Sequence, residues 1–510
     1  MYVVTGEEMR QIDRYTMDQI GMSEELLMEN AGQAFVRHLV SSLSQSDDIL
    51  VLIGAGNNGG DGFVIARLLL EQGFKVKTWV IPPEEHIKGT AKLHMNLYRH
   101  CGHPVSNYQT GEAQFSDELK DCSVVVDALL GTGIKGSLRE PYVKVIEQVN
   151  KARKRVISVD IPSGLLASES GGERIGILAD ETYTLQAPKL SAFLYPGAGN
   201  YGELHILDIA IPKRSFEEVS PHRHLITEKK VQATLPQRLG HIHKGQAGRA
   251  LVIGGADTMP GAPTLTTGAC LRAGAGLVTT VIPSRIKYSV SQKITESTFL
   301  FLKDRDGEMT KKALEEDIPF EQFDGIAVGP GLGRKIAKSV HPLLYGFSGP
   351  AVIDADGLFH MSKELHLWSE KPRQSPTIIT PHPGEMAMLT GCTIEEVEKR
   401  RFQCSREFAL KYGVYVVLKG PFTIVTTPKG DQWVNTTGNA SLAKGGSGDV
   451  LTGIILAFLL QHSTVTDAIC NAVHIHGKLA DKMLETHDII SVNASDLILT
   501  LPEVLKSYRY

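Results

Sequence analysis

The sequence predicts an α/β protein with two domains, each built around a parallel β-sheet. Short apolar runs rich in Val and Ile alternate with helix-length segments, which is the pattern of βαβ units. This alternation occurs in two series that a polar segment separates. The chain has 510 residues, enough for two to four domains of about 100–200 residues each. Because the runs are apolar on both faces, we expect helices to cover both sides of each sheet.

The first series predicts six strands joined by helices. Helical periodicity covers the start of the chain, and helix-length segments include residues 62–72 and 142–152. The expected strands are residues 47–54, 75–81, 122–127, 155–160, 181–185 and 204–207.

A polar segment ends the first series. Residues 211–230 are mixed in charge and interrupted by prolines, so we expect a linker or an irregular connection near residues 212–228. The break predicts an N-terminal domain of residues 1–215 and a C-terminal domain of residues 225–510. The strands expected in the second domain are residues 249–253, 277–282, 326–328, 351–354, 377–379, 414–418 and 423–425.

Composition excludes several classes of function. Lys and Arg number 53 against 57 Asp and Glu, a formal net charge of −4 without a long run of one sign, so we expect no nucleic-acid partner. The longest nearly apolar stretch, residues 450–460, is about half as long as a membrane span, so we expect no membrane partner. No signal peptide is visible at the start of the sequence. Six scattered cysteines without a CxxC pair indicate reduced thiols and a cytoplasmic protein.

Polar groups end three strands of the first series. The first strand runs into the glycine-rich loop 54–62, and Asp127 and Asp160 end two later strands. Taken singly, each Asp is better explained as a cap of the following segment. Together the three ends favour a ligand site, because the carboxyl ends of parallel strands meet at one edge of a sheet. Glycine-rich turns at helix starts suit phosphate, and oxygen ligands without His or Cys favour a hard, here monovalent, cation.

The motifs at these strand ends resemble those of the NAD(P)H-hydrate epimerase domain. They are NNGGDG at residues 57–62, VVVDALLGTG at 124–133 and VDIPSG at 159–164, and the resemblance spans residues 1–215. It implies a Rossmann-like fold, interconversion of the R and S epimers of hydrated NAD(P)H, and potassium held by Asn58, Asp127 and Ser163. It also implies contacts of the hydrated cofactor with Asn57, Asn58, Gly59, Gly60, Asp61, Gly131, Thr132, Gly133, Ile134, Lys135, Gly136, Ser137, Tyr142 and Asp160.

Epimerisation needs a group that accepts a proton and returns it. Inversion at the hydroxyl-bearing ring carbon requires such a group at the ring. We assign this role to Asp160, the carboxylate at a strand end beside the expected cation. Asp61 is the alternative, although a role in structuring its loop explains it at least as well.

The second series carries a glycine-rich helix start with its own chemistry. The sequence GGSGD at residues 445–449 leads into an apolar helix. Its amides suit a transferring phosphoryl group, which the helix dipole also stabilises. Asp449 in the first turn is placed to accept a hydroxyl proton; the alternative is that Asp449 only caps the helix. His382 lies between two prolines, which favours a fixed ligand contact, although a lone His is more often structural.

These loops resemble the ribokinase-like superfamily and, more closely, the ADP-dependent NAD(P)H-hydrate dehydratases. GPGLG, DADGL, TPHPGE, LKG and GGSGDVLTG occur in the family's order within residues 229–510, with Ser441 where the family often has Gly and Ser447 in place of Thr. The resemblance implies a ribokinase-like α/β domain. It implies contacts of the hydrated cofactor with Ala262, Gly331, His382 and Asp449, and of ADP or AMP with Lys419, Gly420, Pro421, Phe422, Thr423 and Gly448.

The sequence therefore predicts a bifunctional enzyme that repairs NADHX and NADPHX, the hydrated forms of NADH and NADPH. The N-terminal domain would equilibrate the epimers, and the C-terminal domain would dehydrate the S form while ADP becomes AMP and phosphate. Magnesium is expected from phosphoryl-transfer chemistry, and we expect a homo-oligomer of undetermined size. The preference between NADHX and NADPHX stays open, as does ADP against ATP without the resemblance.

Two other functions compete with this interpretation. One is a vitamin-precursor kinase of the hydroxyethylthiazole or hydroxymethylpyrimidine type with an accessory N-terminal domain. The other is a binding or scaffolding role for residues 1–215. Convergence of Asn58, Asp127, Asp160 and Ser163 around one cation would argue against the scaffold.

Overall fold

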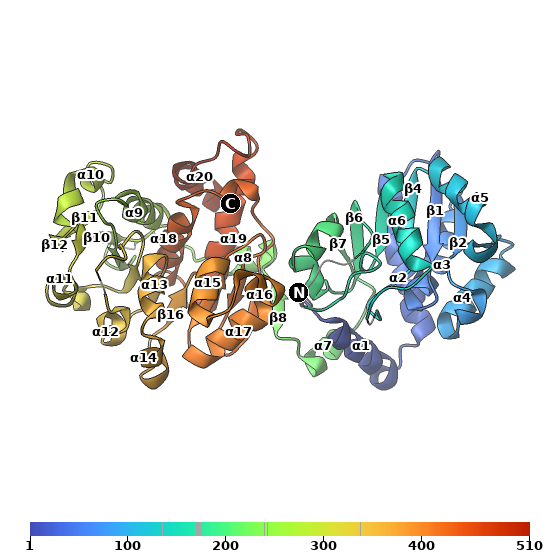
Figure 1. Ribbon diagram of the computed structural model, residues 1–510, viewed down its shortest axis with the longest axis horizontal. Coiled ribbons are helices and arrows are strands. Elements are labelled where there is room, and N and C mark those ends of the chain that lie inside the picture. The colour runs from blue at the N-terminus through green and yellow to red at the C-terminus, as the bar shows by residue number, and fades with distance from the viewer. Residues whose placement is uncertain (135, 170–174, 239, 242, 337, 510) are drawn as a thin grey trace. The chain divides into compact units, whose positions relative to one another are not determined.

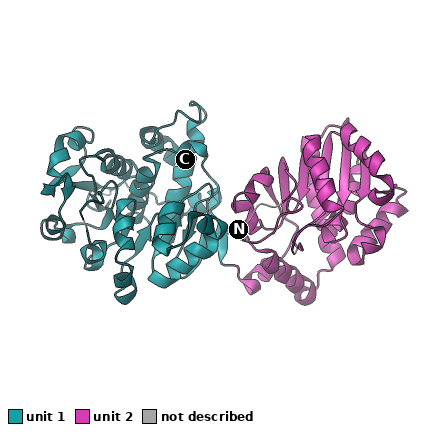
Figure 2. Ribbon diagram, in the orientation of Figure 1, with its two compact units in different colours: residues 1, 222–510 teal, residues 2–221 magenta. Residues whose placement is uncertain are grey.

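The chain forms two compact units (Figure 2). The computed structural model describes residues 1–134, 136–169, 175–238, 240–241, 243–336 and 338–509. The N-terminal unit comprises residues 2–221, and the C-terminal unit comprises residues 222–510 together with Met1. The division between Pro221 and His222 lies inside the polar segment that separates the two series of strands.

A seven-stranded parallel sheet forms the centre of the N-terminal unit. Its strand order is β3-β2-β1-β4-β5-β6-β7. Six strands agree with the expected ranges to within two residues at each end, whereas the two-residue β3 was not predicted. The strands are β1 (Asp48–Ile53), β2 (Lys75–Val80), β3 (Ser106–Asn107), β4 (Val124–Ala128), β5 (Arg155–Val159), β6 (Glu181–Leu185) and β7 (Glu203–Leu207).

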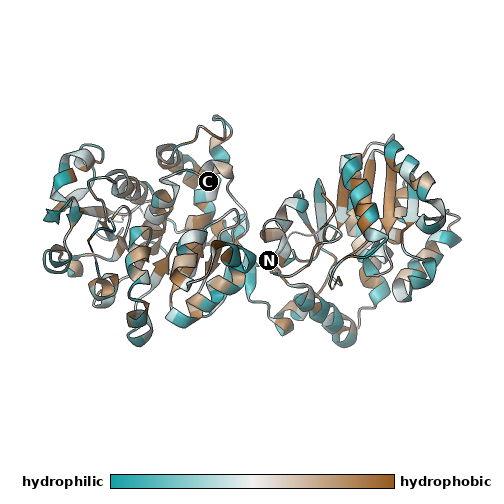
Figure 3. Ribbon diagram, viewed as in Figure 1, coloured by the Kyte–Doolittle hydropathy of each residue, from teal (hydrophilic) through white to brown (hydrophobic). Residues whose placement is uncertain are grey.

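Helices cover both faces of this sheet, as the apolar strands predict (Figure 1). Ile49, Val51 and Ile53 of β1 pack under α2 (Glu24–Leu39), α3 (Asn57–Glu71) and α4 (Gly89–His100). Leu50 and Leu52, which point to the opposite face, pack under α5 (Tyr108–Asp121) and α6 (Tyr142–Ala152). Figure 3 shows the hydrophobic strands between helices with more hydrophilic surfaces. The α/β class is thereby confirmed.

The helix at the start of the chain packs against the end of the same unit. Thr5 and Glu8 form a capping box at the start of α1 (Gly6–Tyr15). Met9 and Ile12 of this helix share a buried cluster with Phe216 of α7 (Lys213–Val219). The short helical segments of this unit are Thr16–Ile20, Val40–Ser42, Glu84–His86, Leu190–Phe193 and Gly197–Asn200.

The expectation of an irregular connection over residues 212–228 is wrong. This segment forms α7 and β8 (Arg223–Leu225), and α8 (Glu228–Thr234) begins at its end. Three strand residues and two turns of helix are too short to produce a clear hydrophobic period. β8 pairs in parallel with β19 (Gln432–Val434), so the C-terminal unit begins at residue 222 and includes strand residues before 225.

The C-terminal unit is built on a ten-stranded sheet. Its order is β11-β10-β9-β14-β15-β16-β17-β18-β19-β8, and only the pairs β17–β18 and β18–β19 are antiparallel. All seven expected strands are present, whereas β8, β11 and β19 were not predicted. The remaining strands of this sheet are β9 (Arg249–Ile253), β10 (Leu277–Pro283), β11 (Thr298–Leu302), β14 (Gly325–Val328), β15 (Ala351–Ile353), β16 (Thr377–Ile379), β17 (Tyr415–Leu418) and β18 (Ile424–Thr426). A separate pair joins β12 (Asp304–Arg305) to β13 (Glu308–Met309).

The apolar helix that follows GGSGD lies in the core of this unit. In α18 (Ser447–Leu459), every residue from Val450 to Phe458 is buried, and the helix packs against α9 (Gly261–Arg272), α19 (Val465–Met483) and α20 (Ala494–Ser507). The other helices are α10 (Lys287–Ser291), α11 (Lys311–Glu316), α12 (Val340–Tyr345), α13 (Asp356–Ser362), α14 (Leu365–Glu370), α15 (Pro383–Thr390), α16 (Ile394–Lys399) and α17 (Arg401–Tyr412), with short turns at Ser284–Ile286, Phe320–Gln322 and Ala440–Leu442. Among the described residues, no helix has the length and apolar character needed to span a membrane.

Candidate active sites

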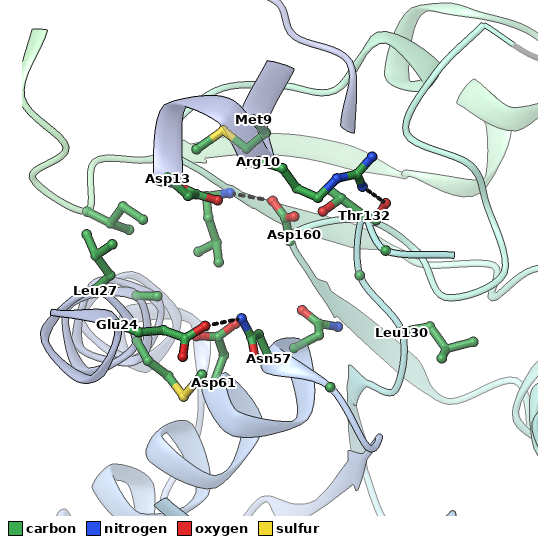
Figure 4. Close-up of a pocket in the computed structure, with 18 of the residues that line it drawn as sticks. Met9, Arg10, Asp13, Glu24, Leu27, Asn57, Asp61, Leu130, Thr132 and Asp160 are labelled. Atoms are coloured by element: carbon green, nitrogen blue, oxygen red, sulfur yellow. Dashed lines mark hydrogen bonds between the residues drawn. The ribbon is translucent and has the colours of Figure 1, made fainter. Parts of the chain in front are cut away.

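A cavity of about 590 Å³ opens at the carboxyl ends of the strands in the N-terminal unit (Figure 4). It lies where the loops after β1 and β4 diverge, which is the point at which the strand order reverses. The starts of α2 and α3 and one side of α1 complete its wall. The predicted residues that line it are Asn57, Asn58, Asp61, Gly131, Thr132, Gly133, Ile134 and Asp160.

Other predicted contacts of the N-terminal site lie outside this lining. Gly59 and Gly60 are buried within α3, and a Cβ at Gly60 would press on the side chain of Met28, so this glycine lets α3 approach α2. The Tyr142 hydroxyl group is hydrogen-bonded to the backbone of Ala55, within the glycine-rich loop 54–62. Gly136 and Ser137 are exposed. Lys135 lies outside the described residues.

Asp160 has one carboxylate oxygen anchored in the fold. It follows β5 with a φ of 68°, a left-handed conformation that turns the chain into the loop after the strand. Its Oδ1 accepts hydrogen bonds from the Leu185 amide (3.0 Å) and from the ammonium group of Lys189. Only 8% of Asp160 and 1% of Lys189 is exposed. Since no described residue bonds Oδ2, this oxygen is available to a ligand in the cavity.

Asp127 and Ser163 form a second, fully buried arrangement. The Ser163 hydroxyl donates to Asp127 Oδ1 (2.6 Å), and the Ser163 amide donates to Oδ2 (2.9 Å). The Leu130 amide donates to the Ser163 hydroxyl (2.9 Å), which ties this pair to the loop after β4. Asn58 lies against Gly131 of the same loop, and its Nδ2 is buried with no hydrogen-bond partner among the described residues. Asp127, Ser163 and Asn58 thus gather around one loop, whereas Asp160 faces Lys189.

Three further carboxyl groups face the cavity. Asp61 is 8% exposed and has no hydrogen-bond partner among the described residues; burial, followed by the charges of Asp160 and Asp13, raises its pKa well above the ordinary value. Burial also raises the pKa of Asp13 to about 6. Glu24 accepts hydrogen bonds from Asn57 (2.7 Å) and Thr90 (2.6 Å).

Asp13, Glu24 and Lys189 were not predicted from the sequence. Asp13 is one of several charged residues on an amphipathic helix, and the charged face of such a helix normally points to solvent. Nothing in the sequence spacing of Glu24 or Lys189 separates them from the many other charged residues of the chain.

The C-terminal unit brings several predicted loops together around Lys419. The Lys419 ammonium group lies 3.0 Å from Asp354 Oδ1 and 3.8 Å from Glu385 Oε2. Thr452 of α18 donates to the other oxygen of Asp354 (2.7 Å). A Cβ on Gly448 would lie 3.3 Å from Lys419 Nζ, so the start of α18 lies directly beside this cation. Thr452 was not among the predicted residues.

Asp449 lies in the first turn of α18, as predicted, and has an unusual environment. Burial, followed by the charge of Asp354, raises its pKa to about 7, although Lys419 acts in the opposite direction. Asp356 and Glu385 add further negative charge. A carboxyl group with a pKa near neutrality can accept and release a proton at physiological pH.

His382 has a clear structural role. Its Nδ1 accepts hydrogen bonds from the amides of Gly384 (3.0 Å) and Glu385 (3.4 Å), so it caps α15, and Glu385 returns a bond to the His382 amide. Nε2 lies 3.6 Å from Glu385 Oε1, and 57% of the side chain is exposed. Ala262 and Gly331 are neighbours, because a Cβ on Gly331 would lie 3.1 Å from that of Ala262.

A buried arginine holds the loop predicted to bind adenine nucleotide. Arg401 Nη2 donates to the carbonyl oxygens of Leu418 (3.3 Å), Lys419 (3.1 Å) and Phe422 (3.2 Å). Nη1 pairs with Glu398, and the residue is 2% exposed. Arg401 thereby fixes the backbone from Leu418 to Phe422. Sequence analysis did not identify it, because it belongs to a helix outside the loop motifs.

Two protein-family models match the chain. The model described as YjeF-related protein N-terminus matches residues 24–191, and the model described as NAD(P)H-hydrate dehydratase matches residues 250–503. Each match falls within one of the two compact units.

Curated relatives extend over the whole chain. The bifunctional NAD(P)H-hydrate repair enzyme of Moorella thermoacetica is 35% identical over 518 residues, which covers 99% of this chain and 97% of the relative. The enzyme of the same name from Thermofilum pendens is 35% identical over 514 residues, covering 100% and 97%. Among solved structures, the ADP/ATP-dependent NAD(P)H-hydrate dehydratase of Bacillus subtilis, co-crystallised with ATP and Mg²⁺, matches with a TM-score of 0.50 and 35% identity, covering 56% of this chain and 99% of that structure.

Proposed function

The chain belongs to the family of bifunctional NAD(P)H-hydrate repair enzymes, and we propose how its two units divide the work. The function is repair of hydrated NAD(P)H: the R and S forms are interconverted, and the S form is dehydrated to NAD(P)H as ADP becomes AMP and phosphate. The N-terminal unit performs the epimerisation and the C-terminal unit the dehydration. One observation carries this division: each unit is matched by its own family model and has its own carboxylate-bearing site at the ends of its strands.

In the N-terminal unit, Asp160 Oδ2 accepts the proton of the hydroxyl group on ring carbon C6. As the O–H electrons form the C6=O bond, the C6–N1 bond breaks and its electron pair passes to N1, which is conjugated with the ring carboxamide. Rotation about C5–C6 presents the other face of the aldehyde. N1 then attacks C6, and Asp160 returns the proton to the oxygen. Lys189 supports the role by holding Oδ1 in place.

The residues of this unit also fit a monovalent cation. Asn58, Asp127 and Ser163 offer oxygen donors with a single negative charge, and the buried amide of Asn58 lacks a hydrogen-bond partner among the described residues. Rotating that amide by 180° places its oxygen where the unpaired nitrogen lies. We propose that these residues hold potassium, which would supply positive charge near a phosphate-bearing ligand.

The remaining predicted residues of the N-terminal site have different roles in this proposal. The side chain of Asn57, which Glu24 orients, and the backbone from Gly131 to Ile134 bind the hydrated cofactor at the cavity wall. Gly59 lets the start of α3 approach the backbone of Gly54, and Gly60 lets α3 approach Met28 of α2.

In the C-terminal unit, Asp449 accepts the proton of the C6 hydroxyl. The oxygen attacks the terminal phosphorus of ADP, and the bond from that phosphorus to the bridging oxygen breaks, so that AMP leaves. The N1 lone pair then expels phosphate from C6, and loss of a proton from C5 yields NAD(P)H. Lys419 lies beside Gly448 at the start of α18, and in this proposal Lys419 and the amides at residues 445–448 stabilise the phosphoryl group. Magnesium, which accompanies ATP in the B. subtilis relative, would neutralise phosphate charge when bound.

We assign each ligand of this unit to the predicted residues that lie close together. We assign the hydrated cofactor to the neighbouring residues Ala262 and Gly331, together with His382 and Asp449. We assign ADP to the loop from Lys419 to Thr423 that Arg401 holds, next to Gly448. The vitamin-precursor kinase is disfavoured, because relatives named as repair enzymes match across both units.

The direct test uses a mixture of R and S NADHX. The chain should convert the whole mixture to NADH when ADP is present, and without ADP it should bring the two epimers to equilibrium without forming NADH. Chromatography that resolves both epimers and NADH gives the result. Conversion of the S form alone would contradict an epimerase function of the N-terminal unit. We also propose a cytoplasmic homo-oligomer, whose number of copies light scattering would give.

A further inference from the structure

Helix α1 forms part of the N-terminal cavity although it precedes the region that the family model matches. Met9, Arg10, Asp13, Arg14 and Met17 line the cavity, and their spacing of three or four residues places them on one side of the helical segment. The helix thus presents a continuous stripe to the space that the substrate would occupy.

Hydrogen bonds at both ends hold α1 in this position. Val4, just before the helix, accepts a hydrogen bond from the Leu190 amide (2.9 Å) and donates to Pro188 (3.0 Å), so it brackets Lys189. At the other end, the Thr16 hydroxyl donates to Ser215 (2.8 Å). The register of α1 relative to Lys189 is therefore fixed.

Asp13 differs from the other acidic residues of this helix. Glu7 pairs with Arg10, Glu8 caps the helix, and Arg10 also bonds the carbonyl of Thr132 (3.2 Å). The Asp13 carboxylate has no hydrogen bond or ion pair within the described part of the chain. In Figure 4 it extends from α1 on the same side of the cavity as Asp160. No hydrogen bond or ion pair among the described residues therefore gives the half-buried Asp13 side chain a role in stabilising the fold.

The charges around Asp13 come from every element that packs around the cavity. They are Arg10 and Arg14 on α1, Glu24 on α2, Asp61 on α3, Asp160 after β5 and Lys189 after β6. Burial and the nearby acids raise the pKa of Asp13 to about 6, whereas Lys189 lowers it. Asp13 therefore exchanges protons near neutral pH, unlike an ordinary surface carboxyl group.

The proposed ring opening leaves negative charge on N1, which a second proton would neutralise. When the C6–N1 bond breaks, N1 receives an electron pair, and Asp160 has already taken the hydroxyl proton. A donor near N1 would neutralise the charge that develops there and would recover its proton when N1 attacks C6 again. Without such a donor, the charge must be carried by the conjugated carboxamide alone.

We propose that Asp13 is this second proton-transfer group, donating to N1 on ring opening and accepting the same proton on closure; this inference rests on the proposed epimerase function. The proton balance closes within each turnover, because Asp160 and Asp13 each end in the state in which they began. No further reactant is required. Asp13 acts in its protonated form, so epimerisation slows as pH rises above about 6.

The test compares Asp13→Asn and Asp13→Glu with Asp18→Asn in the full chain. Asp18 is an exposed residue just after α1 that does not line the cavity. Epimerisation of pure R NADHX by Asp13→Asn should fall at least ~10²-fold in kcat, with a smaller change in KM. Its remaining rate should lose the decline above about pH 6, Asp13→Glu should restore part of the rate together with that decline, and Asp18→Asn should match the unsubstituted chain. Dehydration of S NADHX should not change.

Two results would overturn the inference. One is epimerisation by Asp13→Asn at the parent rate with the parent pH profile. The other is loss of activity together with a lowered Tm, which would assign Asp13 a structural role. The unsubstituted chain keeps these outcomes separate from the proposed function: if it does not epimerise NADHX, the function fails, whereas a parent that epimerises beside an equally active Asp13→Asn contradicts only the role of Asp13.

Discussion

The ammonium group of Lys189 contacts the carboxylate of Asp160 in the wall of the N-terminal cavity, and both residues are almost completely buried. Lys189 also donates to the carbonyl oxygen of Leu185 (3.1 Å), so the cation is fixed by the end of β6. The contact provides one positive charge in a cavity that four carboxyl groups face: Asp13, Glu24, Asp61 and Asp160. Lys189 is therefore central to both the stability and the charge state of this site.

Replacing Lys189 with Met should destabilise the N-terminal unit. The change leaves Asp160 buried without its cation, and breaking one side of a buried ion pair costs about 3–5 kcal/mol of unfolding free energy. Urea unfolding of residues 1–221 measures this loss. The double variant Lys189→Met/Asp160→Leu should recover part of it, because no unpaired buried charge remains. Equal stability of Lys189→Met and the parent would show that the contact is energetically neutral.

Replacing Asp160 with Asn should stop epimerisation and leave dehydration intact. The amide keeps the size of the side chain and can still accept hydrogen bonds through its oxygen, but it cannot take a proton from the hydroxyl group. Loss of a general base predicts a decrease of ~10²–10⁴-fold in the interconversion of R and S NADHX. Dehydration of pure S NADHX with ADP is the internal control. An unchanged epimerisation rate would move the role to Asp61 or to water.

Replacing Arg401 with Lys should weaken ADP binding in particular. The single ammonium group of a lysine lacks the planar fork with which Arg401 bonds Glu398 through one nitrogen and the carbonyl oxygens through another. Losing two hydrogen bonds of about 0.5–1.5 kcal/mol each predicts roughly a tenfold higher KM for ADP. The KM for S NADHX should change less. Arg400→Lys, at the exposed neighbouring position, is the matched control. Equal effects on both substrates would indicate general loosening of the unit rather than positioning of the nucleotide loop.

Each unit should work without the other, provided that the cut respects β8. Residues 1–221 should epimerise NADHX, and residues 222–510 should dehydrate its S form. A version that starts at residue 227 removes β8 and leaves the outer edge of β19 unpaired. Its Tm should therefore be lower than that of residues 222–510. Identical melting of the two versions would show that β8 contributes nothing to the sheet.

Dehydration should increase with pH through about 7. The pKa of Asp449 is raised to about 7, and only its ionised form accepts the hydroxyl proton. Asp449→Asn should lose at least ~10²-fold in kcat, whereas Asp317→Asn, an exposed control, should not. Burial of Asp449 favours its protonated form, so the folded state loses stability as the pH rises from the ordinary pKa of a carboxyl group to about 7. Asn carries no charge, and Asp449→Asn should therefore melt no lower than the parent at pH 8. A flat pH profile would remove Asp449 as the base.

The sequence predicted the strands better than it predicted the interactions between side chains. Strands such as residues 249–253 are short, apolar and bounded by glycine-rich loops, so their pattern is unambiguous. β8 and α7 were missed because elements of three and seven residues carry too little periodicity, and β8 gains its structure by pairing with β19, which is distant in sequence.

For the site, motifs located the loops but not the residues that other elements bring to them. Asp61 and Asp449 belong to glycine-rich sequences at helix starts, which indicate a ligand site from sequence alone. Asp13, Lys189 and Arg401 are ordinary charged residues in sequence, and only tertiary packing places them in a cavity wall or under a loop. His382 shows the opposite case, because its distinctive sequence context also serves to cap α15.

Turnover of pure R NADHX in the presence of ADP tests the two-site account most directly, because this substrate must pass through both sites. The parent chain should convert it completely to NADH. Asp160→Asn should leave the R form unreacted beyond its spontaneous epimerisation, and Asp449→Asn should accumulate the equilibrium mixture of R and S forms without NADH. Mixing the two variants should restore NADH formation, because each supplies the site that the other lacks. NADH formation by Asp160→Asn at the parent rate, or none in the mixture of variants, would contradict the account.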